Sequence, residues 1–573
     1  MFRVAPTKVQ AGDPQRPWLR FYDAGVAPTL RYPDTTLFGA LAAAAERDPW
    51  APAWSFEGTQ QHYSVLIDEI ERCSRALAQL GLRAGDRILV VLPTVPHAVV
   101  ILYAAARMGV VSAFVHPQST AAELTHYLDA TGATTVVSLD LFYPNLSAAR
   151  PSKPITLMLL GRIGDYLGPL KRLAFNWTRR RQIEAVPADS RVRWWQHSLS
   201  IPGAVPAPAS IASDQPAVIL FSGGTTDLPK GIVLSHRAII AQGMQAAAWG
   251  GIGSGQSMLA ILPVFHGFGL GVCINATLMA GGHSLLVPRF DAQQVAQLIR
   301  KQRPNVIVGV PTLFESLARD PALEGIDWSF LRAAFSGADT LPKPVKDAFE
   351  ARVAAGRGDV RLLEGYGLTE SVTAIMAMPR GHYRESSIGL PFPDMLAKIC
   401  VPGSEESVAD GEEGEICVTG PTLMLGYLDA PDATAQALRR HADGRVWLHS
   451  GDLGRRDAEG FFYFGVRLKR IIKSSGFNVF PAQVEAVLQQ HPAVAAACVV
   501  GVPDPRQVER VIAIVVARAP TQANPLLAET LITHCQDHLI KWSCPREVYF
   551  RSSLPTTRVG KIDYRALTLE HSR

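Results

Sequence analysis

The fold is decided by the stretch Ala217-Val218-Ile219-Leu220-Phe221-Ser222-Gly223-Gly224-Thr225-Thr226-Asp227-Leu228-Pro229-Lys230-Gly231. Its first five residues form an apolar run that predicts a buried strand, and small and hydroxylated residues follow at once. Paired glycines let backbone N–H groups approach an anion without interference from a Cβ atom, and the hydroxyls and the lysine add donors that suit phosphate oxygens. The stretch differs from the common P-loop, in which Gly-Lys-Ser/Thr opens a helix, because Pro229 precedes the lysine. Taken alone, it is compatible with a phosphate-binding loop and with an ordinary turn.

Helical and strand-like periods alternate on both sides of this stretch. Apolar residues recur at helical spacing from Leu66 to Leu80, and Gly81 follows as a C-terminal cap. Further strands are predicted at 87–92, 110–115, 134–138, 258–263, 283–287 and 305–309, and further helices at 98–108, 121–130, 236–248, 267–279 and 291–302. Repeated units of this kind predict an α/β fold with parallel sheets covered by helices on both faces.

The residue pattern changes after Pro379. Short strand-like runs separated by turns with glycine and acidic residues predict a small β-rich subdomain at about 381–467. We therefore expect a large N-terminal domain at 1–467 and a small mobile α+β domain at 468–573. The β-rich strands are expected at 396–401, 414–419, 446–448 and 460–464; the C-terminal elements are helices at 481–490 and 525–540 and strands at 494–501, 511–516 and 546–550.

Composition limits the class of protein. The 573 residues are 47% hydrophobic and 19% charged, as in globular proteins with large buried sheets. A net charge of +5 is mild for this length and argues against a nucleic-acid partner. The seven cysteines form no CxxC pair, which favours reduced thiols and a cytoplasmic location. We find no signal segment, and the most apolar stretch, 88–115, is broken by prolines, His97 and Arg107.

The segment 162–195 combines one apolar helical face with a run of cations. Leu170, Leu173 and Trp177 share that face, and Lys171 and Arg172 belong to the basic set. Two interpretations stay open, a solvated surface helix and a peripheral contact with an anionic membrane, here the inner face of the cell membrane.

Further motifs follow the glycine-rich loop in order. They are Leu262-Pro263-Val264-Phe265-His266-Gly267, Phe335-Ser336-Gly337-Ala338-Asp339, Glu364-Gly365-Tyr366-Gly367-Leu368-Thr369-Glu370, His449-Ser450-Gly451-Asp452 and Thr556-Thr557-Arg558-Val559-Gly560-Lys561. The third motif places an aromatic ring, a hydroxyl and a carboxylate within five residues, a set able to stack a base, contact a phosphate and hold Mg²⁺. Asp452, after a turn, is suited to accept from two ribose hydroxyls. Singly, each motif is also compatible with a glycine-rich turn or a solvated lysine.

Taken in order, the motifs resemble those of acyl-adenylate-forming (AMP-binding) enzymes over residues 35–570. The amino-acid sequences of segments 16–22 and 475–481 are most similar to those of long-chain fatty acyl-CoA synthetases. The resemblance implies that a carboxylate attacks the α-phosphate of ATP, giving acyl-AMP and pyrophosphate, and that the thiol of CoA then displaces AMP.

The resemblance also implies roles for residues in the first half-reaction. Thr369 would meet the α-phosphate, Glu370 would bind Mg²⁺, and His266 would lie near the acyl carboxylate. Lys561 would bridge the carboxylate and α-phosphate oxygens and stabilise the charge that builds up in transfer. The remaining ATP contacts would be Ser222, Gly223, Gly224, Thr225, Thr226 and Lys230 on the β- and γ-phosphates, Gly337, Ala338, Asp339, Gly365, Tyr366 and Gly367 around the adenine, and Asp452 and Arg467 on the ribose.

For the second half-reaction, the resemblance makes Lys469 the hinge between the two domains. Rotation about it would withdraw Lys561 and bring Lys473 toward the thiol acceptor, so that one site serves two steps in turn. The other residues implied in the thiol step are Ser475, Gly476 and Phe477.

The chain departs from the family pattern at three places. Asp227 replaces a glycine after Thr225-Thr226; we expect its carboxylate to point outward, the alternative being weakened ATP binding. Asp339 replaces a smaller or apolar residue, and Val508-Glu509 stands where Gly-Glu is usual. None of these changes removes Lys561, so we expect an active enzyme.

The leading hypothesis is ATP-dependent ligation of a medium- or long-chain fatty acid to CoA. The alternatives are transfer of the acyl group to a carrier protein, β-lactone formation from a β-hydroxy fatty acid, and a non-catalytic nucleotide-binding scaffold motivated by Asp227. The nucleotide motifs do not separate the first three, because they share the adenylation step.

Overall fold

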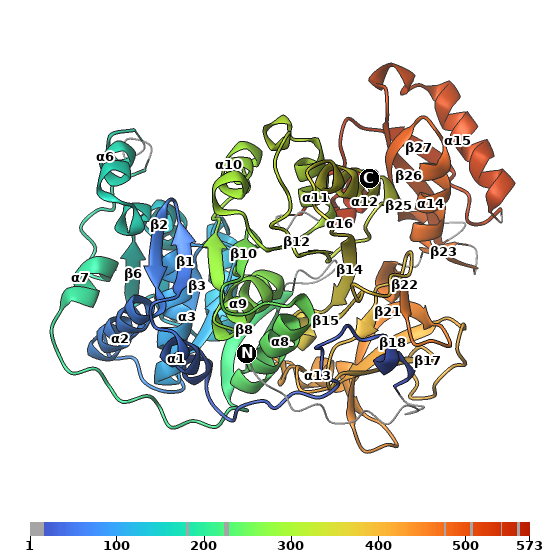
Figure 1. Cartoon of the computed structure of the whole chain (residues 1–573). Coiled ribbons are helices and arrows are strands. Elements are labelled where there is room, and N and C mark those ends of the chain that lie inside the picture. The colour runs from blue at the N-terminus through green and yellow to red at the C-terminus, as the bar shows by residue number, and fades with distance from the viewer. Residues whose placement is uncertain are drawn as a thin grey trace. The chain divides into compact units, whose positions relative to one another are not determined.

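The computed structural model describes residues 16–178, 183–222, 229–470, 472–474, 477–504, 508–539, 541–557 and 562–572 (Figure 1). These residues divide into two compact units. The first holds the described residues up to 397 together with 418–448, and the second holds 398–417 and the described residues from 449 onward. The domain boundary expected near residue 467 stays a prediction.

A nine-stranded sheet forms one layer of the first unit. Its strand order is β16-β15-β14-β13-β12-β10-β11-β1-β2. The strands are β1 (Pro52–Phe56), β2 (Thr59–His62), β10 (Ser257–Ala260), β11 (His283–Leu286), β12 (Val306–Gly309), β13 (Ala333–Ser336), β14 (Leu362–Gly367), β15 (Ala374–Ala377) and β16 (Leu390–Pro391). The strands from β1 through β14 in this order are parallel, and the two edges close with antiparallel partners.

An eight-stranded sheet forms a second layer of the same unit, in the order β19-β9-β8-β4-β3-β5-β6-β7. The strands are β3 (Arg87–Val91), β4 (Val111–Phe114), β5 (Thr135–Leu139), β6 (Leu157–Gly161), β7 (Val192–Trp194), β8 (Pro216–Ser222), β9 (Lys230–Ser235) and β19 (Gly426–Tyr427). Four residues of β3 in succession are buried, as expected for a parallel strand covered by helices on both faces.

Helices fill the space between these two sheets and cover their outer faces (Figure 1). α8 contacts both β8 and β15, so it lies between the sheets, and every residue of α3 is buried. One outer core joins α4 and α5 to β3–β6, and another joins α10, α11 and α12 to β10–β14. The helices of this unit are α1 (Leu37–Arg47), α2 (Tyr63–Gln79), α3 (Pro96–Met108), α4 (Ala121–Thr131), α5 (Tyr143–Ala148), α6 (Pro169–Thr178), α7 (Trp195–Ser200), α8 (His236–Gly250), α9 (Thr277–Met279), α10 (Ala292–Gln302), α11 (Pro311–Arg319), α12 (Lys343–Ala355) and α13 (Pro431–Ala437).

A third sheet is formed by β17 (Leu396–Cys400), β18 (Gly414–Thr419), β20 (Leu438–Arg440), β21 (Val446–Arg456) and β22 (Phe462–Arg467). The division between the two units runs through these strands. The C-terminal section adds a sheet of order β24-β23-β26-β25, with β27 paired to β26. Its elements are β23 (Ile472–Ser474), β24 (Phe477–Val479), α14 (Pro481–Gln490), β25 (Val494–Asp504), β26 (Val508–Ala517), α15 (Pro525–His538), β27 (Glu547–Phe550) and α16 (Tyr564–His571).

The α/β fold class is confirmed, and most expected elements begin and end within a few residues of the predicted bounds. Two expectations were wrong in detail. The helix expected at 267–279 is a π-helix over Phe268–Ala276 that continues as α9; Gly269 packs against the Pro263 carbonyl there, where no Cβ would fit. Asp452, expected after a turn, lies inside the long strand β21, because Gly451 with φ +70° bends the strand without ending it.

No helix among the described residues is long and apolar enough to cross a membrane. The exposed apolar face expected near 170–177 is present on α6, where Leu170, Leu173 and Trp177 are 83%, 68% and 81% exposed.

Candidate functional site

The glycine-rich loop joins the two strands of an antiparallel hairpin. β8 and β9 pair along their length, and the pairing ends with Ser222 opposite Lys230. The two ends of the loop are therefore held about 5 Å apart, the Cα spacing of an antiparallel pair. The imidazole Nε2 of His126 on α4 lies 3.3 Å from the carbonyl oxygen of Pro229, next to one end of the loop. Gly223, Gly224, Thr225, Thr226 and Asp227 lie outside the described residues, so the departure at Asp227 stays untested.

Lys230 and Glu370 are brought together by a residue that the motifs did not identify. Tyr427 on β19 donates a hydrogen bond from its hydroxyl to Glu370 Oε1 at 2.9 Å. The Lys230 ammonium lies 5.6 Å from the centroid of the same ring. Burial, and then the negative charge of Glu370, raise the pKa of Tyr427 far above its usual range, so the phenol stays protonated as a donor. The ring thus connects the end of the glycine-rich loop to the predicted metal ligand.

Backbone pairing explains why Tyr427 reaches both residues. β19 pairs with β9, with Tyr427 opposite Ile232, so the tyrosine belongs to the same sheet as Lys230. Two residues before β19, the backbone N–H of Met424 donates to the Glu370 carbonyl at 2.8 Å. The strand β19 consists of Gly426 and Tyr427 alone, and nothing in the sequence indicated that this two-residue strand would pair with β9.

Thr369 and Glu370 stand on a short 3₁₀ turn, η7 (Thr369–Ser371), that follows β14 directly. Both side chains are half-buried. The turn is fixed at its end, since Ser371 Oγ lies 2.5 Å from Thr422 Oγ1 and Val372 adopts a φ of +66°. A β-branched residue with this φ is strained, and surrounding contacts must hold it there.

His266 lies next to this turn. An added Cβ at Gly267 would come within 1.8 Å of the Val372 carbonyl oxygen, so only glycine permits the close approach of the two segments. The half-buried His266 ring accepts a hydrogen bond at Nδ1 from the backbone N–H of Phe268, 3.2 Å away. That bond leaves Nε2 as the protonated nitrogen of the neutral ring. The segment that carries His266 therefore packs against Val372, the residue that follows the Thr369–Ser371 turn, and the role predicted for His266 stays a prediction.

Of the two segments predicted to frame the adenine, residues 337–339 follow β13 and residues 365–367 form the end of β14. β13 and β14 are parallel, with Ser336 opposite Glu364, so the two segments begin at the same level of the sheet. An added Cβ at Gly337 would lie 3.3 Å from the Gly365 carbonyl oxygen, which shows how closely the segments pack. The six predicted residues are therefore neighbours: Gly337, Ala338, Asp339, Gly365, Tyr366 and Gly367.

Exposure differs among these residues. Tyr366 is 9% exposed, whereas Ala338 and Asp339 are exposed, and Ala338 has a φ of +70°. Asp339 accepts a hydrogen bond at Oδ1 from the backbone N–H of Thr340 at 2.8 Å, which anchors the carboxylate to its own turn. The departure at Asp339 therefore places a carboxylate at an exposed turn next to the segment predicted to frame the adenine.

The two residues predicted to bind the ribose form an ion pair within the second unit. Asp452 on β21 and Arg467 on β22 are opposite each other, and Arg467 Nε lies 3.1 Å from Asp452 Oδ1. The Asp452 side chain is 1% exposed and that of Arg467 is 51% exposed. The arginine therefore balances the buried charge of the aspartate and fixes the orientation of its carboxylate.

The residues predicted for the thiol step are described only in part. Lys473 on β23 is exposed, and its backbone N–H donates to Glu509 Oε2 at 2.7 Å. Lys469 belongs to the 3₁₀ turn η8 (Leu468–Arg470) and Phe477 opens β24, but their side chains are not described. Ser475, Gly476 and Lys561 lie outside the described residues.

Val508, which replaces a usual glycine, adopts a φ of +71° and is 67% exposed. This conformation suits glycine and strains a β-branched residue. The following Glu509 nonetheless reaches the Lys473 backbone. With Val508 in place of the usual glycine, the hydrogen bond between Glu509 and the Lys473 backbone is therefore present, and the backbone at Val508 is strained.

Comparisons with known proteins identify the family of the chain. The AMP-binding enzyme family matches residues 41–428, and the C-terminal domain of AMP-binding enzymes matches residues 483–561. The chain belongs to the AMP-binding enzyme family and is an ATP-dependent, AMP-forming acid–thiol ligase. ATP and CoA are substrates of AMP-binding acyl-CoA ligases.

Similar proteins span almost the whole chain. The long-chain-fatty-acid–CoA ligase of Bacillus subtilis is 33% identical over 565 residues, covering 97% of this chain and 98% of its own. The enzyme of the same name from Salmonella typhimurium is 33% identical, covering 96% and 97%. The crystal structure of ATP-bound MatB from Rhodopseudomonas palustris gives a TM-score of 0.80 at 24% identity, covers 94% of this chain and 99% of that chain, and supports the fold.

Proposed function

We propose that this chain is a long-chain fatty acyl-CoA synthetase. The observation that carries the proposal is the 33% identity, over nearly the full length of both chains, to relatives named long-chain-fatty-acid–CoA ligase. In the first step a fatty carboxylate attacks the α-phosphorus of ATP, the bond to the bridging oxygen breaks, and pyrophosphate leaves. In the second step the sulfur of CoA attacks the acyl carbon, AMP leaves, and the thiol proton passes to solvent.

The hairpin of β8 and β9 would hold the leaving pyrophosphate. Lys230, at the start of β9, is exposed and carries the positive charge. Ser222, Gly223, Gly224, Thr225 and Thr226 would supply backbone N–H groups and hydroxyls. Because β8 pairs with β4 in the sheet and β9 pairs with both β8 and β19, the loop stands on a rigid base. Rigid donors stabilise the negative charge that develops on the departing group without reorganising at the moment of reaction.

Mg²⁺ would be held by Glu370. This ion prefers oxygen ligands, and it is commonly bound by one or two carboxylates together with substrate phosphates and water. A half-buried carboxylate oriented by a tyrosine hydroxyl 2.9 Å away fits that donor set. When bound, the ion would neutralise phosphate charge, and Tyr427 would orient the carboxylate. Thr369, one residue earlier, would donate to the α-phosphate.

His266 would lie at the acyl carboxylate. Its Nδ1 accepts from the Phe268 backbone, so the neutral ring carries its proton on Nε2. In that tautomer the ring can donate to a carboxylate oxygen without adding a full charge. Gly337, Ala338, Asp339, Gly365, Tyr366 and Gly367 would frame the adenine, and Asp452, oriented by Arg467, would accept from the ribose hydroxyls.

For the two half-reactions, we propose that residues 468–573 act as a mobile domain hinged at Lys469. Lys561 would serve adenylation by bridging the carboxylate and α-phosphate oxygens. Lys473, Ser475, Gly476 and Phe477 would serve the thiol step. The support for this assignment is the match of the C-terminal family domain to residues 483–561 and the position of Lys469 in a short turn between β22 and β23.

We also propose that α6 rests on the cytoplasmic face of an anionic membrane. Leu170, Leu173 and Trp177 are strongly exposed on this helix, and Lys171 and Arg172 flank them. Exposed apolar residues flanked by cations are typical of helices that lie in the interface of anionic bilayers. A fatty acid partitions into bilayers, so this contact would place the enzyme at its substrate. Binding to vesicles of mixed anionic and neutral lipid should fall in Leu173→Glu, whereas Leu569→Glu, which alters an exposed leucine on α16, should bind as the unaltered chain does.

The proposed function is tested by ATP–pyrophosphate exchange and thioester formation. Fatty acids of increasing length, with and without a β-hydroxyl group, are supplied with ATP, Mg²⁺ and CoA. We expect exchange with medium- and long-chain acids and acyl-CoA as the product. Exchange with no fatty acid would refute the proposal. Release of AMP from β-hydroxy acids without any thiol would indicate β-lactone formation, and transfer only to a carrier protein would identify a different acceptor.

A further inference from the structure

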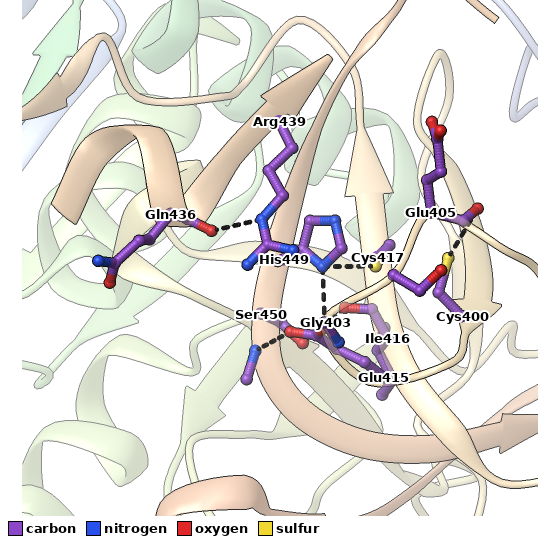
Figure 2. A network of polar contacts seen from close by, with 12 residues as sticks. Cys400, Gly403, Glu405, Glu415, Ile416, Cys417, Gln436, Arg439, His449 and Ser450 are labelled. Carbon is purple, nitrogen blue, oxygen red and sulfur yellow. Dashed lines mark hydrogen bonds and ion pairs between the residues drawn. The ribbon is translucent and has the colours of Figure 1, made fainter. Parts of the chain in front are cut away.

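A buried cluster of four side chains in the second unit has no part in the proposed reaction. We call Cys400, Glu415, Cys417 and His449 the thiol–imidazole cluster. Their exposed fractions are 0%, 4%, 0% and 8%, so the cluster is shielded from water. Cys400 ends β17, Glu415 and Cys417 lie on β18, and His449 lies on β21 (Figure 2). Glu415 and Cys417 are two residues apart in one strand, so both point to the same face of the sheet.

The atoms of this cluster converge on the His449 ring. Nδ1 of His449 lies 2.8 Å from Glu415 Oε2 and 3.5 Å from Cys417 Sγ (Figure 2). One ligand atom from each of these three residues lies within 4.8 Å of the other two. Cys400 ends β17, the strand next to β18 in the sheet, and its Sγ lies 3.8 Å from the Glu405 carbonyl oxygen. With the Cys400 thiol from this neighbouring strand, the available donors are two sulfurs, one imidazole nitrogen and one carboxylate oxygen.

Protons alone satisfy this arrangement poorly. A single proton on Nδ1 has two acceptors, the carboxylate and the thiol sulfur, and it can form a short, straight bond to only one of them. A divalent cation at this position could bind the imidazole nitrogen, the carboxylate oxygen and the sulfurs at once, since its charge offsets that of two thiolates.

We propose that Cys417, His449 and Glu415, with Cys400 as the fourth ligand, bind a zinc ion. Two sulfurs, an imidazole and a carboxylate form a donor set that suits tetrahedral Zn²⁺, and a site with four protein ligands is a structural one. Binding would release the two thiol protons to solvent, and the neutral His449 ring would bind through Nδ1 with its one ring proton on Nε2. No bond to carbon changes and no redox step is needed.

The site would stiffen the strand that carries Asp452. Glu415 Oε1 accepts a hydrogen bond from the Gly451 backbone N–H at 2.9 Å, and Glu415 Oε2 accepts from Gly403 N–H at 3.3 Å. Glu415 would therefore act as a metal ligand and a backbone anchor at once. His449 precedes Asp452 by three residues on the same strand, so the metal would hold both sides of the bend at Gly451.

The test uses cobalt as a spectroscopic substitute for zinc in the full-length chain. The purified protein is stripped with a chelator, given one equivalent of Co²⁺, and examined for thiolate-to-cobalt charge transfer in the near ultraviolet. We expect this band, with loss on addition of zinc, in the unaltered chain and in Cys535→Ser, which alters a buried thiol in another cluster. We expect a clearly weaker band in Cys417→Ser, because only the Cys400 thiolate then remains. Absence of the band from the unaltered chain, or a band of unchanged strength in Cys417→Ser, overturns the proposal.

A second measurement keeps the test decisive if Cys417→Ser does not fold. The unaltered chain is alkylated in mild denaturant with and without zinc, and labelling of each cysteine is measured by mass spectrometry. Zinc should slow the labelling of Cys400 and Cys417 at least tenfold and leave Cys535 unchanged. Equal labelling rates with and without zinc would overturn the proposal.

Discussion

Replacing Tyr427 by phenylalanine tests the connection between the glycine-rich loop and the predicted metal ligand. The change removes one oxygen, and with it the 2.9 Å hydrogen bond to Glu370, while it keeps the ring beside Lys230. A hydrogen bond to a charged group contributes about 1.5–3 kcal/mol. If that energy is used to orient Glu370 in the transition state, the rate of adenylation should fall roughly 10- to 150-fold, since each 1.36 kcal/mol is a factor of ten.

The assay is ATP–pyrophosphate exchange at several Mg²⁺ concentrations. We expect a lower exchange rate and a higher Mg²⁺ concentration at half-maximal rate, because the carboxylate is no longer held in one orientation. Thioester formation from supplied acyl-AMP should be unaffected, since that step does not require the metal ligand in our proposal. A fall confined to the first half-reaction would separate this role from a loss of stability.

The matched control is Tyr143→Phe, which removes a tyrosine hydroxyl that donates to Asp189 at 3.0 Å. It has the same chemistry, and it lies on α5, which packs on β3–β6 in the core of α4 and α5. Its exchange rate should equal that of the unaltered chain. The reasoning would be refuted by a Tyr427→Phe enzyme with an unchanged rate and Mg²⁺ requirement, or by equal losses in both half-reactions.

Three further predictions concern stability and the catalytic cycle. Val508→Gly should raise the free energy of unfolding by about 1 kcal/mol, because it relieves the left-handed backbone at φ +71°; an unchanged urea midpoint would contradict the strain. Burial raises the pKa of Glu69 to about 7 from 4.5, so the folded state favours the protonated acid; stability is fully present below pH 4.5 and falls by about 3 kcal/mol as the pH rises to 7 and above. Glu69→Gln should remove that slope in urea unfolding measured from pH 4.5 to 8, and an unchanged slope would show that another group causes it. Lys561→Ala should abolish pyrophosphate exchange and preserve thioester formation from acyl-AMP; equal loss in both steps would contradict the hinge at Lys469.

The order of helices and strands along the chain was predictable, because the spacing of apolar residues within each segment indicates its type. The apolar run before Ser222 and the run at 87–92 each read as a buried strand, and both are strands of one sheet. The sequence could not assign strands to sheets, since long-range pairs such as Trp54 with Ser284 leave no local mark. For the same reason Tyr427 was missed: its place at β9 depends on a pairing across about 190 residues of chain.

Motif residues were predictable from the sequence where side chains able to bind a ligand stand among glycines that favour a turn. Gly337 follows β13, Gly365 lies in β14 and Glu370 stands on the short turn after β14, and the parallel register brings the first two together. The departures from helical or turn geometry were not predictable. The π-helix at Phe268–Ala276 depends on the approach of Gly269 to the Pro263 carbonyl, and the continuity of β21 depends on the bend at Gly451. Both are results of packing between segments and not of local preference.

A change in the length of the chain within the π-helix would alter which side chains contact residues 369–373. Gly267 and Gly271 both pack against Val372, one just before this helix and one within it. Deleting one residue between them would restore ordinary α-helical closure, and it would turn the side chains on one side of the deletion by about 100° relative to those on the other. A single deletion here would therefore exchange several side chains against that segment at once, without replacing any of them.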